Sequence, residues 1–372
     1  MLIVVTEDWY FCSHRLPLAL AFAAAGCRVS LATRIDRHGD RIRSNNITVH
    51  EVPFWRGSLN PLKALHTFFT LYRLYLREKP DFIHHVALKP VIVGSLAACI
   101  ARSPHVINAL TGLGHVFSSG TWNARLLRNI IRRIFRVILN RHGWAVILQN
   151  SGDLEALNRA GVIQKGRTAL IKGSGVDLRQ YQPGDFMPGM PIAMFAGRLL
   201  RSKGVEEFVQ CCQRINSEGQ RLRCILVGQL DPDNPSALDR NEVDRWIKLG
   251  LAEWWGYRED MPEVLNQARL VCLPTYYGEG LPKILLEAAA CGRPLIATDI
   301  PGCREIVHDG ETGYLVPPRD LDALVNALER LIADPDLCRR MGINARRLAE
   351  DKFSVDKVNQ DTLRLYSELL VS

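Results

Sequence analysis

Two glutamates stand eight positions apart in a segment that reads as a strand, a loop and a helix. The apolar run 270–273 ends in a turn-rich stretch, and a helix-forming sequence begins at Pro282. Proline suits the first helical position because its missing N–H has no helical partner there. We therefore expect Glu279 just before a helix N-terminus and Glu287 inside the helix. Both carboxylates could accept hydrogen bonds from the hydroxyl groups of a ligand.

The same helix start is suited to binding an anion. The first N–H groups of a helix lack helical partners, and the helix dipole adds partial positive charge there. Such a corner typically binds phosphate, and here the backbone of Gly280, Leu281 and Lys283 would do so. A carboxylate beside phosphate must face a neutral, hydroxyl-rich part of the same ligand, as in a sugar nucleotide. On spacing alone, the alternative is a turn glutamate and a solvated helix glutamate.

Two cations follow the expected strand 192–196. Arg198 comes directly after Gly197, and Lys203 precedes the next helix. Arginine binds phosphate oxygens bidentately and lysine acts as a point charge, although each alone is typical of a surface cation. The triplet Asp231-Pro-Asp233 could be mistaken for a metal site, but its prolines and asparagine indicate a polar turn. We expect no metal and no cofactor.

The segment EGLPKILLE from Glu279 to Glu287, followed by AAACGRP, resembles the E-x7-E segment of the GT4 family of retaining glycosyltransferases. In that family the first glutamate contacts the donor sugar and the second contacts the ribose. The resemblance implies a GT-B fold, with two Rossmann-like parallel-sheet domains facing a central cleft and a C-terminal helix crossing back to the first domain. It implies catalytic roles for Glu279, Arg198 and Lys203. The implied donor site consists of Arg198, Lys203, Tyr257, Arg258, Glu279, Gly280, Leu281, Pro282 and Glu287.

A second loop follows the expected strand 105–110. Its sequence, Thr111-Gly112-Leu113-Gly114-His115, resembles a loop of GT4 enzymes that extend lipid-linked glycans. The acceptor site is therefore expected at Thr111, Gly112, Gly114 and His115. Some family members also have a functional histidine in the first domain, for which the candidates are His14, His84, His85 and His115. We include His14, which follows the first strand, among the catalytic residues; the alternative is a polar residue at a helix start.

A basic stretch occupies residues 123–141, which contain six arginines and no acidic residue. The arginines recur every three or four positions, which predicts a basic face opposite an apolar stripe on one helix. Such a helix could lie on an anionic membrane or receive a lipid diphosphate, or it could be an ordinary outer helix packed on the sheet. The expected membrane contacts are Arg125, Arg128, Arg132, Arg133 and Arg136. Nucleic acid is disfavoured because the arginines are not interleaved with a series of aromatic residues.

Charge is distributed unevenly along the 372 residues. Residues 1–183 contain 24 Lys and Arg against 10 Asp and Glu, a net charge of +14, whereas residues 184–372 carry −6. An anionic partner for the first half is indicated. No cationic leader precedes the first strand, no apolar run reaches membrane-spanning length, and the ten cysteines form no C-x-x-C pair. We expect a cytoplasmic protein peripherally associated with the inner membrane.

These features predict four parts of an α/β chain. Residues 1–173 are expected to form an acceptor-binding domain, 174–190 a linker, 191–353 a sugar-nucleotide-binding domain, and 354–372 a helix packing toward the first domain. The resemblance implies metal-independent transfer of a sugar, with N-acetylhexosamine as the best guess. The donor would be a UDP-sugar and the acceptor a polyprenyl-diphosphate-linked saccharide in surface polysaccharide or glycoprotein glycan assembly. Two alternatives are a sugar-nucleotide epimerase of the same architecture and a non-catalytic nucleotide-sugar-binding protein.

Overall fold

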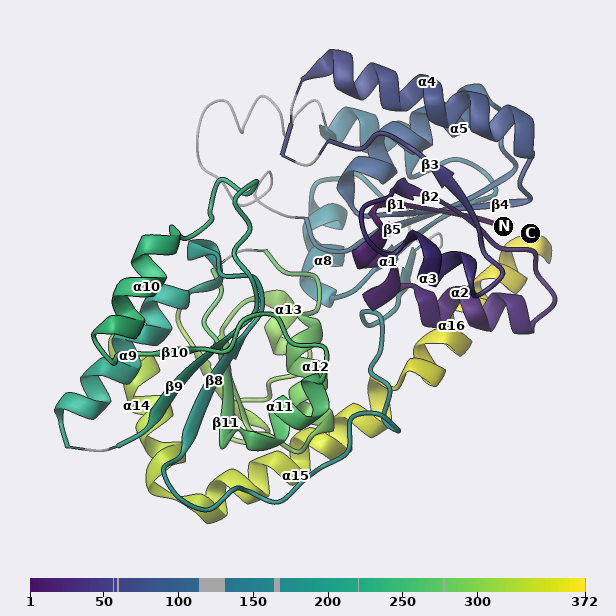
Figure 1. Cartoon of the computed structure of the whole chain (residues 1–372). Coiled ribbons are helices and arrows are strands. Elements are labelled where there is room, and N and C mark those ends of the chain that lie inside the picture. Colours follow the sequence, from purple (N-terminus) through teal and green to yellow (C-terminus); the bar gives the residue numbers. More distant parts are fainter. Residues whose placement is uncertain are drawn as a thin grey trace. The chain divides into compact units, whose positions relative to one another are not determined.

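The computed structural model describes residues 1–55, 57–58, 60–113, 131–163, 168–219, 221–276 and 278–371. The chain divides into two compact units (Figure 1). The first consists of Met1–Ser174 with Val355–Ser372, and the second is Gly175–Ser354. Among the helices of these residues, none is long and apolar enough to cross a membrane.

The first unit is built on a seven-stranded sheet in which every pairing is parallel. Its strand order is β3-β2-β1-β4-β5-β6-β7, so the order reverses between β1 and β4. Ligands of open parallel sheets bind at the carboxyl ends of the strands next to such a reversal. The strands are β1 (Leu2–Glu7), β2 (Ser30–Arg34), β3 (Thr48–Glu51), β4 (Phe82–Val86), β5 (His105–Leu110), β6 (Trp144–Leu148) and β7 (Thr168–Leu170).

Helices cover both faces of this sheet because side chains alternate between the faces of each strand. Leu2 and Val4 of β1 belong to one buried core, and Ile3 and Val5 belong to the other. Apart from the helical residues 131–138, the described helices of the unit are α1 (Asp8–His14), α2 (Leu16–Ala24), α3 (Gly39–Arg43), α4 (Pro61–Glu78), η1 (Pro90–Gly94), α5 (Ser95–Ile100), α8 (Ser151–Arg159) and α16 (Val355–Val371).

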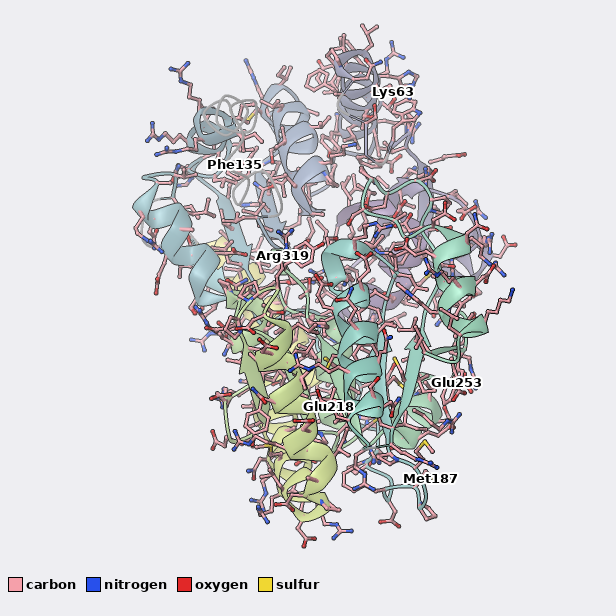
Figure 2. All side chains as sticks on the ribbon, turned by 90° about the vertical axis from the view of Figure 1, so that its left-hand side faces the viewer. Lys63, Phe135, Met187, Glu218, Glu253 and Arg319 are labelled. Carbon is pink, nitrogen blue, oxygen red and sulfur yellow. The ribbon has the colours of Figure 1, made fainter. Side chains whose placement is uncertain are left out.

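The described part of the basic stretch, residues 131–141, begins with a helix that turns its apolar stripe inward. Ile131, Phe135 and Ile138 are buried in the core of the first unit (Figure 2). Arg132 and Arg136 donate to the carbonyl oxygen of Ala160 at 2.9 and 3.2 Å, which caps the C-terminal end of α8. The described residues therefore pack as an outer helix on the first unit, which is one of the two alternatives, and membrane contact by the arginines of this stretch stays a prediction. Of the other expected membrane contacts, Arg133 is exposed, and Arg125 and Arg128 lie outside the described residues.

The last helix, α16, belongs to the first unit, as the expected return of the chain requires. Its Tyr366 hydroxyl forms a buried 2.6 Å hydrogen bond with Nδ1 of His84 in β4. The amide of Asn359 donates to the carbonyl oxygen of Pro17 at 3.4 Å. His84 therefore holds the C-terminal helix and is enclosed, which removes it from the candidates for a functional histidine.

The second unit contains a six-stranded parallel sheet in the order β10-β9-β8-β11-β12-β13. Its strands are β8 (Ile192–Ala196), β9 (Arg223–Val227), β10 (Glu253–Trp254), β11 (Leu270–Leu273), β12 (Leu295–Thr298) and β13 (Gly313–Val316). Its helices are η2 (Arg201–Lys203), α9 (Val205–Ser217), α10 (Arg240–Lys248), α11 (Met261–Gln267), α12 (Lys283–Ala290), α13 (Pro301–Arg304), α14 (Leu321–Ala333) and α15 (Pro335–Lys352). Two parallel α/β units are the fold class that the sequence predicts.

The segment expected to be a linker, residues 174–190, is fastened to the second unit from Gly175 onward. The buried guanidinium of Arg293 donates to the carbonyl oxygen of Gly184. It also lies over the ring of Phe186, with 4.7 Å between the guanidinium carbon and the ring centroid. Arg346 donates to the carbonyl oxygen of Tyr181 at 2.6 Å. Polar side chains from α15 and from the loop after α12 thus order a stretch whose composition alone indicates a flexible connection.

Candidate active site

The candidate residues of the second unit lie where neighbouring parallel strands end. Arg198 follows β8, Asp231 follows β9, and Glu279 follows β11, and these three strands are adjacent in the sheet. Because the carboxyl ends of parallel strands meet at one edge, their loops gather the functional side chains. The sequence predicted Arg198 and Glu279 at this edge.

An ion pair joins the loops after β8 and β11. Lys203 Nζ lies 2.8 Å from Glu279 Oε1, and the two side chains are only 16% and 18% exposed. Ser202 brings the loops together, because its carbonyl oxygen accepts from the backbone N–H of Tyr276 and the hydroxyl of Thr275, each at 3.1 Å. A cation and a carboxylate from separate loops are thus held next to one another beside the start of α12.

Two glycines allow this close packing of loops. Gly204, with φ +76°, follows Lys203, and a Cβ added there would lie 2.2 Å from the carbonyl oxygen of Pro274. A Cβ added at Gly302 would lie 2.3 Å from the carbonyl oxygen of Gly280. Any other residue at these positions would push the Glu279 loop away from its supports.

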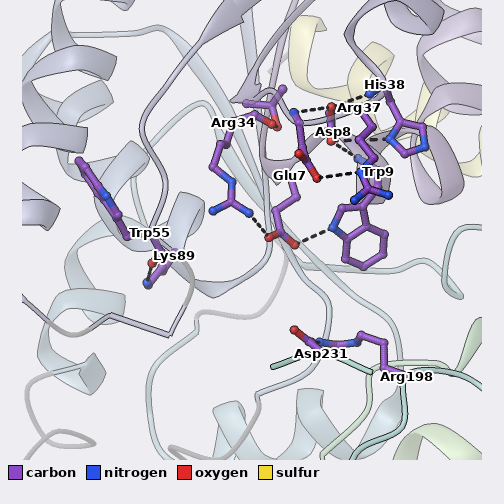
Figure 3. Close-up of polar contacts among 12 residues, drawn as sticks. Glu7, Asp8, Trp9, Arg34, Arg37, His38, Trp55, Lys89, Arg198 and Asp231 are labelled. Atoms are coloured by element: carbon purple, nitrogen blue, oxygen red, sulfur yellow. Dashed lines mark hydrogen bonds and ion pairs between the residues drawn. The ribbon is translucent and has the colours of Figure 1, made fainter. Parts of the chain in front are cut away.

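Arg198 forms an ion pair that the sequence did not predict. Its guanidinium nitrogen lies 2.7 Å from Oδ2 of Asp231, which is buried (Figure 3). The interpretation of Asp231 as a plain turn residue is therefore incomplete, and its position in the loop after a strand was the available signal. A guanidinium has several N–H donors in a planar fork, so Arg198 can bind a second oxyanion while Asp231 fixes its orientation.

Glu287 is buried and receives two contacts. The hydroxyl of Tyr181 donates to Glu287 Oε1 at 2.9 Å, and Lys283 Nζ lies 3.1 Å from the same oxygen. Burial and the neighbouring carboxylate of Glu287 raise the pKa of Tyr181, so its hydroxyl keeps the proton that it donates. Nothing in the spacing of the sequence connects Tyr181 to Glu287, which is 106 positions away.

The remaining expected donor residues differ in their placement. Pro282 was expected at the first position of the helix. It is instead the N-cap of α12, so the helix begins one residue later, at Lys283. The Leu281 side chain packs in the core of the second unit, so only its backbone can face a ligand. Tyr257 is 61% exposed, and Arg258 pairs with Asp260 at 2.7 Å. No hydrogen bond or ion pair found among the described residues joins Tyr257 or Arg258 to the Lys203–Glu279 pair.

In the first unit, the expected acceptor loop is described only in part. Thr111 and Gly112 follow β5 directly, whereas Gly114 and His115 lie outside the described residues. Asp153 at the start of α8 accepts a backbone hydrogen bond from Leu113, and burial raises the pKa of Asp153 to about 6. An ionisable carboxyl group thus adjoins the loop that the sequence singled out.

The described histidine candidates of the first unit lie in different environments. His14 ends α1, shares a hydrogen bond between its Nδ1 and the Ser13 hydroxyl, and stacks on Tyr10 with 4.2 Å between ring centroids. His85 is buried and bonded to Tyr75 and Asn108, and burial lowers its pKa to about 4. His85 is therefore a neutral core residue, as His84 is. Of the described candidates, His14 is the one near a strand's carboxyl end that is not fully buried.

A polar cluster at the ends of β1 and β2 lies on the same edge of the first sheet as α1 (Figure 3). Glu7 accepts from the Trp9 indole N–H and from Arg34, each at 2.9 Å. Asp8 is buried; burial alone would raise its pKa, but the backbone N–H groups of Asp36, His38 and Trp9 outweigh it and lower the pKa. Asp8 thereby ties the loops after β1 and β2 together. The sequence reasoning missed this cluster, although both acids directly end a predicted strand.

No group of three or more His, Cys, Asp or Glu side chains that could hold a metal ion occurs within the part of the chain that the structure describes. The groups that the loops after β8, β9 and β11 bring to this edge are cations and carboxylates that can accept hydrogen bonds from hydroxyls. Its arrangement fits a ligand that has both a phosphate and hydroxyl groups.

Comparisons with known proteins extend over the whole chain. Residues 1–148 match the family model described as glycosyl transferase 4-like, and residues 190–334 match the one described as glycosyl transferases group 1. The alpha-maltose-1-phosphate synthase of Mycolicibacterium smegmatis is 32% identical over 88% of both chains. The N,N'-diacetylbacillosaminyl-diphospho-undecaprenol alpha-1,3-N-acetylgalactosaminyltransferase of Campylobacter jejuni is 26% identical over 96% of this chain and 95% of its own.

A solved structure has the same fold. Anabaena HepE, in complex with UDP and glucose, is 20% identical and superposes with a TM-score of 0.77 over 98% of both chains. At this identity the likeness establishes the two-domain GT-B architecture that the sequence predicted.

Tyr181→Phe is expected to lower the free energy of unfolding by about 1.5 kcal/mol, because it removes a hydrogen bond to a buried, charged acceptor. Urea titration of the full chain measures the change. The control is Tyr257→Phe, the same chemical change at an exposed position, for which the expected change is under about 0.5 kcal/mol. Equal stabilities of the two variants would show that the hydroxyl of Tyr181 does not support Glu287.

Proposed function

The chain belongs to the GT4-like glycosyltransferases, and we propose that it is a retaining, metal-independent hexosyltransferase that uses a UDP-sugar and a polyprenyl-diphosphate-linked saccharide. The observation that carries this proposal is the Lys203–Glu279 pair, 2.8 Å apart at the start of α12. Beside a helix N-terminus, the ammonium suits a phosphate and the carboxylate suits sugar hydroxyls. The family assignment does not support the epimerase or the non-catalytic alternative.

The donor diphosphate binds to Arg198, Lys203 and the backbone of Gly280 and Leu281 in this proposal. Lys203 exchanges the Glu279 oxygen for a phosphate oxygen when the donor arrives, and Glu279 then accepts hydrogen bonds from the sugar. As the bond to the sugar breaks, negative charge grows on the departing UDP. The fixed cations stabilise this charge more in the transition state than in the ground state, which lowers the barrier. The proposal therefore needs no divalent metal.

Glu287 is proposed to bind the ribose of the donor. Its carboxylate is held in place by Tyr181 and Lys283, so little freedom is lost when two hydroxyls bind. Tyr257 and Arg258, in the loop after β10, are proposed to border the nucleobase. Tyr257 is exposed and Arg258 is partly exposed, which is compatible with that role.

Two independent observations support the proposed acceptor. The Campylobacter relative matches 96% of this chain, and its name describes transfer of N-acetylgalactosamine to a diphospho-undecaprenol acceptor. The first half of this chain has a net charge of +14, which suits an acceptor with two phosphates. We propose Thr111, Gly112, Gly114 and His115 for acceptor binding and His14 for catalysis. N-acetylhexosamine is the proposed sugar, and the cytoplasmic face of the membrane is the proposed place of reaction.

The direct test offers purified protein a panel of UDP-, GDP- and ADP-sugars with short polyprenyl-diphosphate saccharides, in buffer that contains EDTA. Transfer from a UDP-N-acetylhexosamine to the lipid-linked acceptor is expected, with undiminished rates in EDTA because no metal takes part. Preference for a GDP-sugar, or efficient transfer to a water-soluble acceptor without phosphate, would contradict the substrate assignment. Activity that appears only after metal is restored would contradict metal independence.

Glu279→Gln is expected to lower kcat by about a hundredfold while leaving UDP binding within about threefold, since the carboxylate faces the sugar and not the nucleotide. Steady-state kinetics and calorimetry with UDP separate the two quantities. Glu263→Gln, which removes a charge from α11 outside the site, is the matched control and should change neither. Unchanged kcat for Glu279→Gln would refute the role given to this carboxylate.

A further inference from the structure

Helix α4 carries an apolar stripe on its solvent side. Leu62, Leu65, Phe69 and Leu76 are 73%, 50%, 47% and 45% exposed. Their spacings of three, four and seven residues place them along one line of an α-helix. Large apolar side chains exposed singly are normal, but four in one line form a patch that indicates an interaction surface.

This stripe is not a consequence of a loosely packed helix, because the other side of α4 is buried. Thr67, Leu71, Leu74 and Tyr75 are enclosed, and the helix packs against α5 and η1 (Figure 1). Asn60 caps its start by accepting from the Leu62 N–H at 2.9 Å. Residues 61–78 therefore form a helix with one apolar side buried and another exposed.

Positive charge accompanies the exposed stripe. Arg73 and Lys63 are exposed on the same helix (Lys63 is labelled in Figure 2), and the single acid of α4, Glu78, is engaged by Arg77 at 2.9 Å. Near the start of α4, Lys63 lies over the Trp55 ring, 5.5 Å from its centroid. A second lysine, Lys89, donates to the Trp55 carbonyl oxygen (Figure 3), and burial, with a smaller effect of the Lys63 charge, lowers the pKa of Lys89.

We propose that this face of α4 docks the first unit on the surface of an anionic phospholipid membrane. Apolar side chains at one level with flanking cations and an indole are the composition of helices that lie in the lipid interface. Cations add attraction to anionic headgroups. This inference rests on the proposed function in one respect, because an enzyme that acts on a lipid-linked acceptor must work at a membrane.

Other occupants fit the surface less well. In a two-fold dimer the same patch of both copies would meet, so Lys63 and Arg73 would face cations of the other copy and repel them. Nucleic acid would satisfy the cations but leave the apolar stripe in water. The helical residues 131–138 offer a smaller apolar surface than α4, because Ile131, Phe135 and Ile138 are in the core and Val137 is the large apolar residue exposed there.

The test compares sedimentation of the full chain with vesicles of phosphatidylglycerol and phosphatidylcholine and with vesicles of phosphatidylcholine alone. Wild type is expected to bind the anionic vesicles, less so at high salt. The double variant Leu65→Gln, Phe69→Gln should bind these vesicles about tenfold more weakly, because two apolar anchors are lost. Lys63→Gln with Arg73→Gln should lose most of the preference for anionic lipid.

The control is Ile247→Gln with Leu249→Gln, the same kind of change at exposed apolar positions of the second unit. It should bind vesicles as wild type does. UDP binding measured on every variant separates this inference from the proposed function, because α4 variants should bind UDP normally. The proposal would be overturned if wild type did not bind anionic vesicles or if the α4 variants bound them as wild type does. It would also be overturned if the α4 substitutions only abolished self-association.

Discussion

The second unit is organised around the ion pair between Lys203 and Glu279, which joins the loops after β8 and β11. Each side chain is less than a fifth exposed, so either charge alone would be costly to leave there. The surrounding structure is arranged to make the pairing available. The Ser202 carbonyl oxygen fixes the two loops together, and Gly204 and Gly302 allow backbone to approach backbone. A ligand with a phosphate and a sugar can replace each partner of the pair with a better one.

The rest of the second unit supports the same edge. Asp231 orients Arg198, and Tyr181 with Lys283 orients Glu287, so each proposed ligand contact has a fixed neighbour. Residues 175–190 are ordered by Arg293 and Arg346 on the second unit. This explains why Tyr181, which lies in that segment, can act on a glutamate in α12. Positioned charged groups cost little reorganisation during a reaction, which is the usual origin of electrostatic catalysis.

Local sequence was sufficient for the strands that border the site and for functional residues in the loops after them, such as Arg198 and Glu279. It was insufficient for pairings between distant residues, because neither Asp231 with Arg198 nor Tyr181 with Glu287 leaves a periodic signal. Periodicity also cannot decide which apolar face is covered. Residues 131–138 and α4 both show an amphipathic pattern, yet the structure buries the stripe of the first and exposes a second stripe on α4.

Amide hydrogen exchange of the full chain with and without UDP tests the central claim most directly, since it reports which loops the nucleotide orders. The account predicts slower exchange at residues 198–204 and 279–283, where the loops after β8 and β11 meet the diphosphate, and little change in the loops of the first unit. Replacing Lys203 with Gln should abolish that protection. Protection confined to the first unit, or equal protection of wild type and Lys203→Gln, would contradict the account.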